Sequence, residues 1–121
     1  MADPIIATAE DRIGANGASF SVHEWRGSGP STMHVHHSDD EAWHVVSGAL
    51  RFRFPDRTVD AQAGSTVFVP AGVPHTYEAV GDARYLIILT PRLRELIEEL
   101  QATPSGEHPE VYRRHDSALV E

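Results

Sequence analysis

The chain has 121 residues, which is the length of one domain with its own hydrophobic core. It carries 18 acidic and 10 basic residues, a formal net charge of -8, so it lacks the basic surface that binds nucleic acid or an anionic membrane. The absence of cysteine and lysine excludes disulfides, thiolate metal sites and lysine Schiff bases. Residues 1–4 do not resemble a signal peptide, and the longest apolar run, residues 85–89, is far shorter than the ~20 residues that cross a bilayer. We therefore expect a cytoplasmic protein with neither nucleic acid nor a membrane as a partner.

The first 90 residues predict an arm followed by many short strands. Residues 1–18 are mixed in composition and are expected to form an N-terminal arm, with Ile5 and Ile6 as its candidate strand. Beyond this arm, short apolar or alternating segments are separated by Gly, Pro, Asp and Ser, a pattern that is typical of a β-sandwich or barrel. The predicted strands lie at residues 19–25, 33–36, 42–46, 50–54, 58–61, 66–69, 75–80 and 84–90.

The pattern changes to that of a helix in residues 91–121. Thr90 can cap a helix and Pro91 suits its first turn. The helix is expected to end before Pro104 and to cover one end or face of the barrel. Residues 107–121 can form either a second short helix or an arm that packs on another subunit. The apolar stripe of the first helix, with spacing i, i+3, i+4, i+7, consists of Leu93, Leu96, Ile97 and Leu100.

Histidine supplies the strongest functional signal. His34 and His36 point to the same face of one predicted strand, because side chains alternate along a strand, and their Cα atoms are about 7 Å apart. That spacing lets both imidazoles bind one ion. Glu41 follows after a turn, and His75 follows a loop that is framed by two prolines. Three imidazoles and one carboxylate suit Fe, Mn, Ni, Cu or Zn and leave open coordination positions, which is typical of catalysis or ligand capture.

The other histidines do not fit this site. His37 is adjacent to the pair but points to the opposite face of the strand. His44 is out of phase with the carboxylate and is expected at the surface or an interface, and His23 is expected in the core or at the surface. His108 and His115 lie in the C-terminal tail and are expected to be exposed to solvent.

The first block of site residues resembles a motif of the cupin superfamily. In that motif an HxH pair is followed by Glu after three or four residues and by Gly after six more. His34, His36, Glu41 and Gly48 have this spacing, with four and six intervening residues. The glycine that precedes the pair in the family is out of register in this chain, so the loop before the pair is expected to differ.

The second block also resembles a cupin motif, in which Gly, Pro-x-Gly and His have fixed spacing. Gly64, Pro70, Gly72 and His75 have that spacing. Ala79 stands where the family has Asn, and this departure removes a polar group near the site without removing a ligand. The two blocks together resemble the small, quercetinase-like cupins with one conserved barrel.

The resemblance implies an all-β fold, the cupin double-stranded β-helix, which is a barrel similar to a jelly roll. Residues 19–90 would form this barrel, with the N-terminal arm of residues 1–18 before it. Residues 91–121 would form a C-terminal amphipathic helix and tail. Members of the family commonly form homodimers through sheet edges and terminal arms, and we expect a homodimer here.

The resemblance also implies a metal site and an activity. His34, His36, Glu41 and His75 would hold one divalent transition metal per chain. The family likeness favours a dioxygenase that acts on an enol, a phenol or a β-diketone. A non-redox cyclase or isomerase that uses zinc is an alternative, as is a cupin that captures a small molecule without turnover.

The residues expected inside the barrel indicate which kind of ligand could bind there. Arg51 and Arg53 alternate with the apolar positions and should face outward, so the cavity would lack a cation for phosphosugars or dicarboxylates. Glu41 is either a metal ligand or the catalytic base. Tyr77 lies two residues after His75 on the same face and is either a catalytic hydroxyl or a core aromatic. The residues expected to line the interior are Leu50, Phe52, Phe54, Val67, Val69 and Tyr77.

Overall fold

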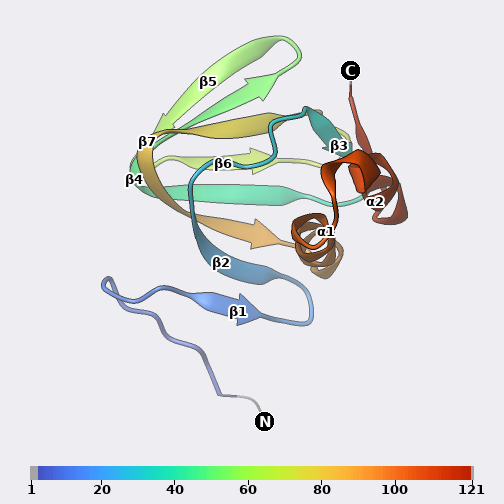
Figure 1. The fold of residues 1–121 in the computed structure, drawn as a ribbon. Helices are drawn as coiled ribbons and strands as arrows, with labels where there is room; N and C mark the ends of the chain where they lie inside the picture. Colours follow the sequence, from blue (N-terminus) through green and yellow to red (C-terminus); the bar gives the residue numbers. More distant parts are fainter. Residues whose placement is uncertain (1–2, 121) are drawn as a thin grey trace.

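A computed structural model describes residues 3–120. Strands make up most of its regular structure, and the helices follow them near the C-terminal end of the chain (Figure 1). In chain order the elements are β1 (Gly14–Asn16), β2 (Ser21–Arg26), β3 (His34–His36), β4 (Glu41–Phe54), β5 (Arg57–Gln62), β6 (Thr66–Val69), β7 (Thr76–Leu89), α1 (Pro91–Gln101), a 3-10 turn (Ser105–Glu107), α2 (His108–Arg114) and β8 (Ser117–Leu119).

The larger sheet is antiparallel and has the strand order β1-β2-β7-β4-β5, with β6 also paired to β4. A smaller sheet consists of β3 and β8, which are joined in antiparallel fashion. Figure 1 shows the larger sheet curving around an interior, with α1 and α2 at one end beside β3. This end of the barrel is where the candidate site lies.

The two longest strands were each expected as two separate strands. Residues 42–46 and 50–54 belong to the single strand β4, and residues 75–80 and 84–90 fall almost entirely within β7. The ladder between β4 and β7 continues through bulges around Ser47, and Gly48 has a φ of 72°. The glycines therefore bend the strands without ending them, because a bulge changes the direction of a strand while its pairing resumes beyond it.

The N-terminal arm contains a strand in a different place from the one expected. Ile5 and Ile6 lie outside any strand and are 62% and 78% exposed. Strand β1 instead pairs with β2, where Gly14 faces His23 and Asn16 faces Ser21. Among the described residues, Ile5 and Ile6 have no strand beside them with which to pair. Residues 14–16 lie beside the edge of β2 and therefore form the strand.

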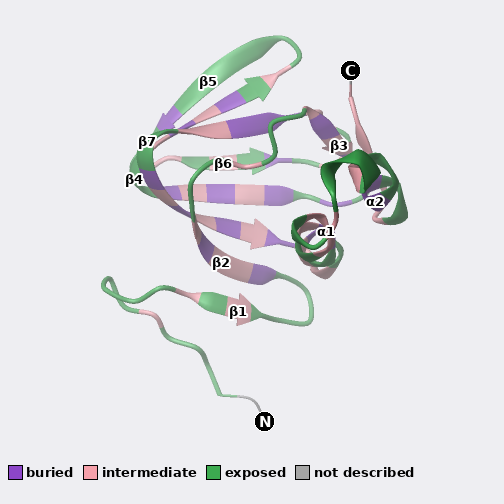
Figure 2. Cartoon of the chain, viewed as in Figure 1, coloured by how far each residue is buried: buried purple, intermediate pink, exposed green. Residues whose placement is uncertain are grey.

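The interior of the barrel is apolar, as expected. Leu50, Phe52, Val69 and Tyr77 are buried, and Phe54 and Val67 are partly buried and pack against them. Figure 2 shows buried stretches along the central strands, while β5 is largely exposed. Arg51 forms an ion pair with Asp60, and Arg53 with Glu78, among exposed side chains, which confirms that both arginines face outward.

The C-terminal helix was predicted correctly. The Leu93 amide donates a hydrogen bond to Thr90 Oγ1 at 3.2 Å, so Thr90 caps α1. Leu93 and Leu96 are buried against the barrel, and the helix ends at Gln101. No helix within residues 3–120 is long and apolar enough to cross a membrane.

The tail beyond this helix packs on its own barrel. Helix α2 begins at His108, which agrees with the expected second helix, and its Val111 and Tyr112 are buried. Strand β8 was not predicted. It pairs with β3, so the last described residues lie beside the strand that carries His34 and His36.

Candidate metal centre

Two different segments bring the three predicted histidines together. His34 and His36 are the first and last residues of β3, and His75 immediately precedes β7. The backbones of His34 and His75 form a bridge, in which each amide donates to the other residue's carbonyl, at 3.0 and 2.9 Å. This bridge fixes the distance between the two segments, so the three side chains meet without depending on loop motion.

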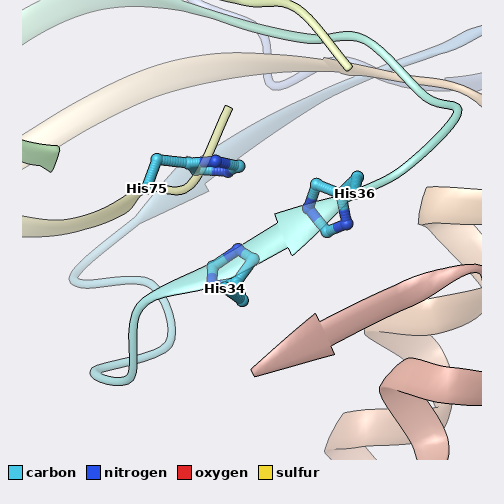
Figure 3. A group of neighbouring side chains, drawn as sticks. All are labelled: His34, His36 and His75. Atoms are coloured by element: carbon cyan, nitrogen blue, oxygen red, sulfur yellow. The ribbon is translucent and has the colours of Figure 1, made fainter. Parts of the chain in front are cut away.

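The three imidazoles face one another in a buried cluster. One ring nitrogen of each of His34, His36 and His75 lies within 4.8 Å of those of the other two. The residues are only 4%, 5% and 1% exposed. Figure 3 shows His34 and His36 on one strand, with His75 extending from a separate segment. Burial matters here because the site is shielded from competing water.

Backbone carbonyls on the outer side of the His34 and His75 rings each engage one ring nitrogen. The Nδ1 atoms of His34 and His75 lie 2.9 Å from the carbonyl oxygens of Thr32 and Val73. A carbonyl can only accept, so both Nδ1 atoms carry protons, and Nε2 is the nitrogen of each ring that is left to bind a metal. This is the tautomer in which a histidine binds a metal through Nε2.

Glu41 completes the cluster from the first residue of β4. Its Oε1 atom lies 3.1 Å from Nε2 of His75 and 3.3 Å from Nε2 of His36, and its side chain is 7% exposed. Burial raises the pKa of the Glu41 carboxyl, but hydrogen bonds and charge interactions with the two histidines outweigh burial and lower the pKa to about 2. Glu41 is therefore ionised across the physiological pH range.

These side chains fit a divalent transition metal. Burial, reinforced by the charge of His75, lowers the pKa of His34 to about 4, so the neutral form that binds metals is favoured. One ring nitrogen of each of the three imidazoles lies within reach of a single ion, and the Glu41 carboxylate contacts two of these rings. Nitrogen and oxygen donors in this ratio suit Fe, Mn, Ni, Cu or Zn.

Tyr77 lies beside this cluster but its hydroxyl is already engaged. Its hydroxyl oxygen is 3.2 Å from that of Tyr85, which donates to the carbonyl of Gly27 at 2.6 Å. Its ring packs 5.4 Å from Trp43, measured between ring centroids. Burial, followed by the influence of Tyr85, raises the pKa of Tyr77 well above its usual value. Tyr77 is thus a core aromatic that also reaches the site, and its catalytic role remains a prediction.

The remaining histidines lie away from the three that cluster. His37 immediately follows β3 and is exposed, as expected. His108 and His115 were expected to be exposed, and this was wrong. His108 Nε2 lies 2.8 Å from the Thr103 carbonyl, and His115 Nε2 lies 2.7 Å from Oε2 of Glu99. Both histidines hold the tail against α1. This role could not be predicted from the sequence, because the packing of the tail was not predicted.

Two cavities that share several lining residues lie near the cluster. A narrow inner cavity touches His34, His36 and Glu41, and a larger one of about 460 Å³ lies beside it. Sequence reasoning missed Tyr112 here, whose ring centroid is 5.4 Å from that of His34. No local motif marks this tyrosine, because only the fold of the tail places it there. The residues that line both cavities are Pro30, Tyr77, Ile87, Ile97, Leu100 and Tyr112.

The family of the chain follows from a match that covers both motifs. Residues 21–90, more than half of the chain, match the family model of the cupin domain. The chain belongs to the cupin superfamily. An uncharacterized protein of Streptomyces coelicolor is 38% identical to this cupin over 56 residues, which are 46% of this chain and 53% of the relative. This match therefore spans about half of the relative's length.

Solved cupin structures resemble the whole barrel. A protein from Shewanella frigidimarina with a cupin-2 domain aligns with a TM-score of 0.59 and 24% identity, covering 70% of this chain and 84% of that one. A cupin from Bacteroides fragilis aligns with a TM-score of 0.60 and 14% identity, covering 73% of this chain and 82% of that one. At these identities the likeness shows the fold alone, and it confirms the predicted double-stranded β-helix.

Proposed function

We propose that this cupin is a metal-dependent dioxygenase for a small, uncharged enol, phenol or β-diketone. The observation that carries the proposal is a cluster of three histidines, of which His34 and His36 line a largely apolar cavity together with Glu41. Among the described residues, no arginine lines either of the two neighbouring cavities. A substrate with a phosphate or several carboxylates would find no arginine side chain to pair with there, whereas a neutral molecule fits an apolar cavity with a few polar groups.

His34, His36, His75 and Glu41 would hold the metal. When bound, the ion would supply a Lewis acid for an enolic oxygen and, for Fe, Mn, Ni or Cu, redox activity toward O2. In the proposed reaction both atoms of O2 enter the products and one carbon–carbon bond of the substrate breaks, so no external reductant is needed. For a β-diketone the products are a carboxylic acid and a 1,2-dicarbonyl compound.

The side chains around the metal would prepare the substrate. Glu41, being ionised, would accept the proton that an enol or phenol loses on binding, and would return it to the carboxylate product. The walls that Leu93, Leu96 and Ile97 contribute to the inner cavity would exclude water from this proton transfer. Tyr77 and Tyr112 would contact the ring or the planar enol of the substrate, since both line both cavities.

Turnover by the full chain, loaded separately with each metal, tests this proposal. The substrates are catechols, flavonols and β-diketones, supplied with or without isotopically labelled O2. We expect a redox-active metal to support O2-dependent cleavage in which both labelled oxygen atoms enter the products. O2-independent conversion with zinc would overturn the proposal in favour of a cyclase or isomerase. Binding of these molecules without turnover by any metal form would overturn it in favour of a binding protein.

A further inference from the structure

The C-terminal strand β8 lies beside the strand that carries the HxH pair. Residue by residue, Leu119 faces His34 and Ser117 faces His36 in the antiparallel register. Two more backbone hydrogen bonds extend this pairing: the Val120 amide donates to Met33, and the His37 amide donates to Asp116, at 2.8 and 2.9 Å. The cupin family match ends at residue 90, so β8 belongs to a part of the chain that this match does not cover.

Ser117 makes a direct contact with one of the proposed metal ligands. Its Oγ atom lies 2.7 Å from Nδ1 of His36, and both residues are buried. The same hydroxyl donates to the carbonyl of His115 at 3.1 Å. A serine hydroxyl has one proton, and a carbonyl can only accept. With its proton directed to His115, Ser117 is left as an acceptor for a proton on Nδ1 of His36.

We propose that Ser117 is a positioning residue for the metal site, which holds the proton of His36 on Nδ1 and leaves Nε2 free for the metal. The proposal rests on His36 being a metal ligand, as in the proposed function, but not on any particular reaction. His34 and His75 obtain the same tautomer from backbone carbonyls close to them in sequence. His36 obtains it from a residue 81 positions away.

Without this acceptor a different arrangement becomes favourable. A proton on Nε2 of His36 would point at Oε1 of Glu41, only 3.3 Å away. That proton would occupy the nitrogen that the metal needs, and the metal would have to displace it. Ser117 therefore acts by favouring one of the two tautomers of His36. A hydrogen-bond partner on the ring nitrogen that does not bind the metal commonly changes the affinity of a histidine site for its metal.

Several contacts hold β8 in the position that this role requires. The residue before Ser117, Asp116, has a φ of 53°, so the chain turns sharply into the strand. The Asp116 carboxylate accepts a hydrogen bond from Arg92 of α1 at 3.0 Å and another from Ser38. His115 is fixed to Glu99 of α1. The carbonyl that orients the Ser117 hydroxyl is thus anchored to the helix that covers the barrel.

Ser117→Ala tests the proposal, with Ser21→Ala as the matched control. Both serines are 1% exposed, but the Ser21 hydroxyl has no hydrogen-bond partner among the described residues. The affinity for Zn²⁺ is measured by competition with a chromophoric chelator. We expect Ser117→Ala to weaken Zn²⁺ binding by about 10- to 100-fold and Ser21→Ala to leave it unchanged. An equal loss in both variants, or no loss in Ser117→Ala, would overturn the proposal.

A second measurement tests the proposal in the unaltered chain as well as in the variant. Nitrogen-15 NMR of histidine side chains in the metal-free full chain reports which ring nitrogen of His36 carries a proton. We expect a proton on Nδ1 in the unaltered chain and its transfer to Nε2 in Ser117→Ala. An unprotonated Nδ1 in the unaltered chain would overturn the role of Ser117. This result is independent of turnover, so a failed search for dioxygenase activity would leave the tautomer result intact.

Discussion

Oε1 of Glu41 lies 3.1 Å from Nε2 of His75, although Glu41 begins β4 and His75 immediately precedes β7, and these two long strands pair in opposite directions. Glu41 faces Leu89 at one end of the β4–β7 ladder, and Arg53 faces Thr76, next to His75, at the other end. In a straight ladder these ends would be ~40 Å apart, at about 3.3 Å per residue. The carboxylate and the imidazole meet because the ladder curves back on itself around Gly48.

We predict that a change at Gly48 disturbs both the fold and the site. A Cβ atom at Gly48 would lie 2.4 Å from the Asp82 carbonyl oxygen, and the residue has a φ of 72°. Gly81 is the control, because its φ is 70° but a Cβ atom there meets nothing within 4 Å. Gly81→Ala should cost the left-handed strain alone, about 1–2 kcal/mol, and Gly48→Ala more than this. Chemical denaturation measures both, and equal losses would show that the close approach to Asp82 does not matter.

His36→Ala and His37→Ala should differ sharply in metal binding. His36 is buried in the histidine cluster, whereas His37, the residue after β3, is exposed. Removal of His36 takes away one of the proposed ligands, so metal uptake should be lost or strongly weakened. His37→Ala should bind as well as the unaltered chain. Metal content after dialysis checks both variants, and loss of the metal in both would contradict the assignment of ligands.

Glu41→Gln separates the two roles proposed for the carboxylate. Glutamine keeps the size of the side chain and removes its charge. If Glu41 is the base, the histidines should still hold the metal and turnover per bound metal should fall by ~10²–10⁴. If Glu41 is only a ligand, activity should fall in proportion to the metal that is lost. The check is turnover divided by metal content, and unchanged turnover per bound metal would eliminate the base.

We predict that the fold loses stability at high pH because its tyrosines are buried. The sequence contains three tyrosines, and burial raises the pKa of Tyr77 and of Tyr85, while burial and the negative charge of Glu41 raise the pKa of Tyr112 to about 12. The fold therefore favours the neutral phenols. Their contribution to stability is complete below the ordinary pKa of 10 and is lost as pH rises through the higher values in the fold.

Phenolate absorbance and circular dichroism, recorded together as pH is raised, check this prediction. We expect phenolate to appear above the pH at which free tyrosine ionises, and to accompany the loss of the folded spectrum. Ionisation of all three side chains near pH 10 with the fold intact would contradict their burial.

The sequence is sufficient to predict the barrel and the cluster because their signals are local. The HxH spacing places His34 and His36 on one face, and the Gly and Pro residues before His75 mark the loop that presents it. The apolar stripe of α1 is a strong helical signal of the same kind. The sequence did not predict that β4 is one continuous strand. A glycine such as Gly48 usually marks the end of a predicted strand, but here it marks a bend within one.

The tail was the hardest part to predict. Strand β8 is three residues long, and it has no alternation that distinguishes it from a loop. Its pairing with β3 depends on Asp116, Arg92 and Glu99 holding the chain in place, and such contacts join residues far apart in sequence. Ser117 and Tyr112 could therefore be recognised as neighbours of the histidines only in three dimensions. The expected homodimer and the cytoplasmic location remain predictions.

The central claim is that His34, His36, His75 and Glu41 hold one divalent metal ion, and direct stoichiometry tests it best. The chain is purified without a chelator, and its metal content is measured before and after titration with Fe, Mn, Ni, Cu and Zn. We predict saturation at one ion per chain, abolished when His34, His36 and His75 are all replaced by alanine. A chain that takes up none of these metals, or a triple variant that still binds one ion per chain, would contradict the claim.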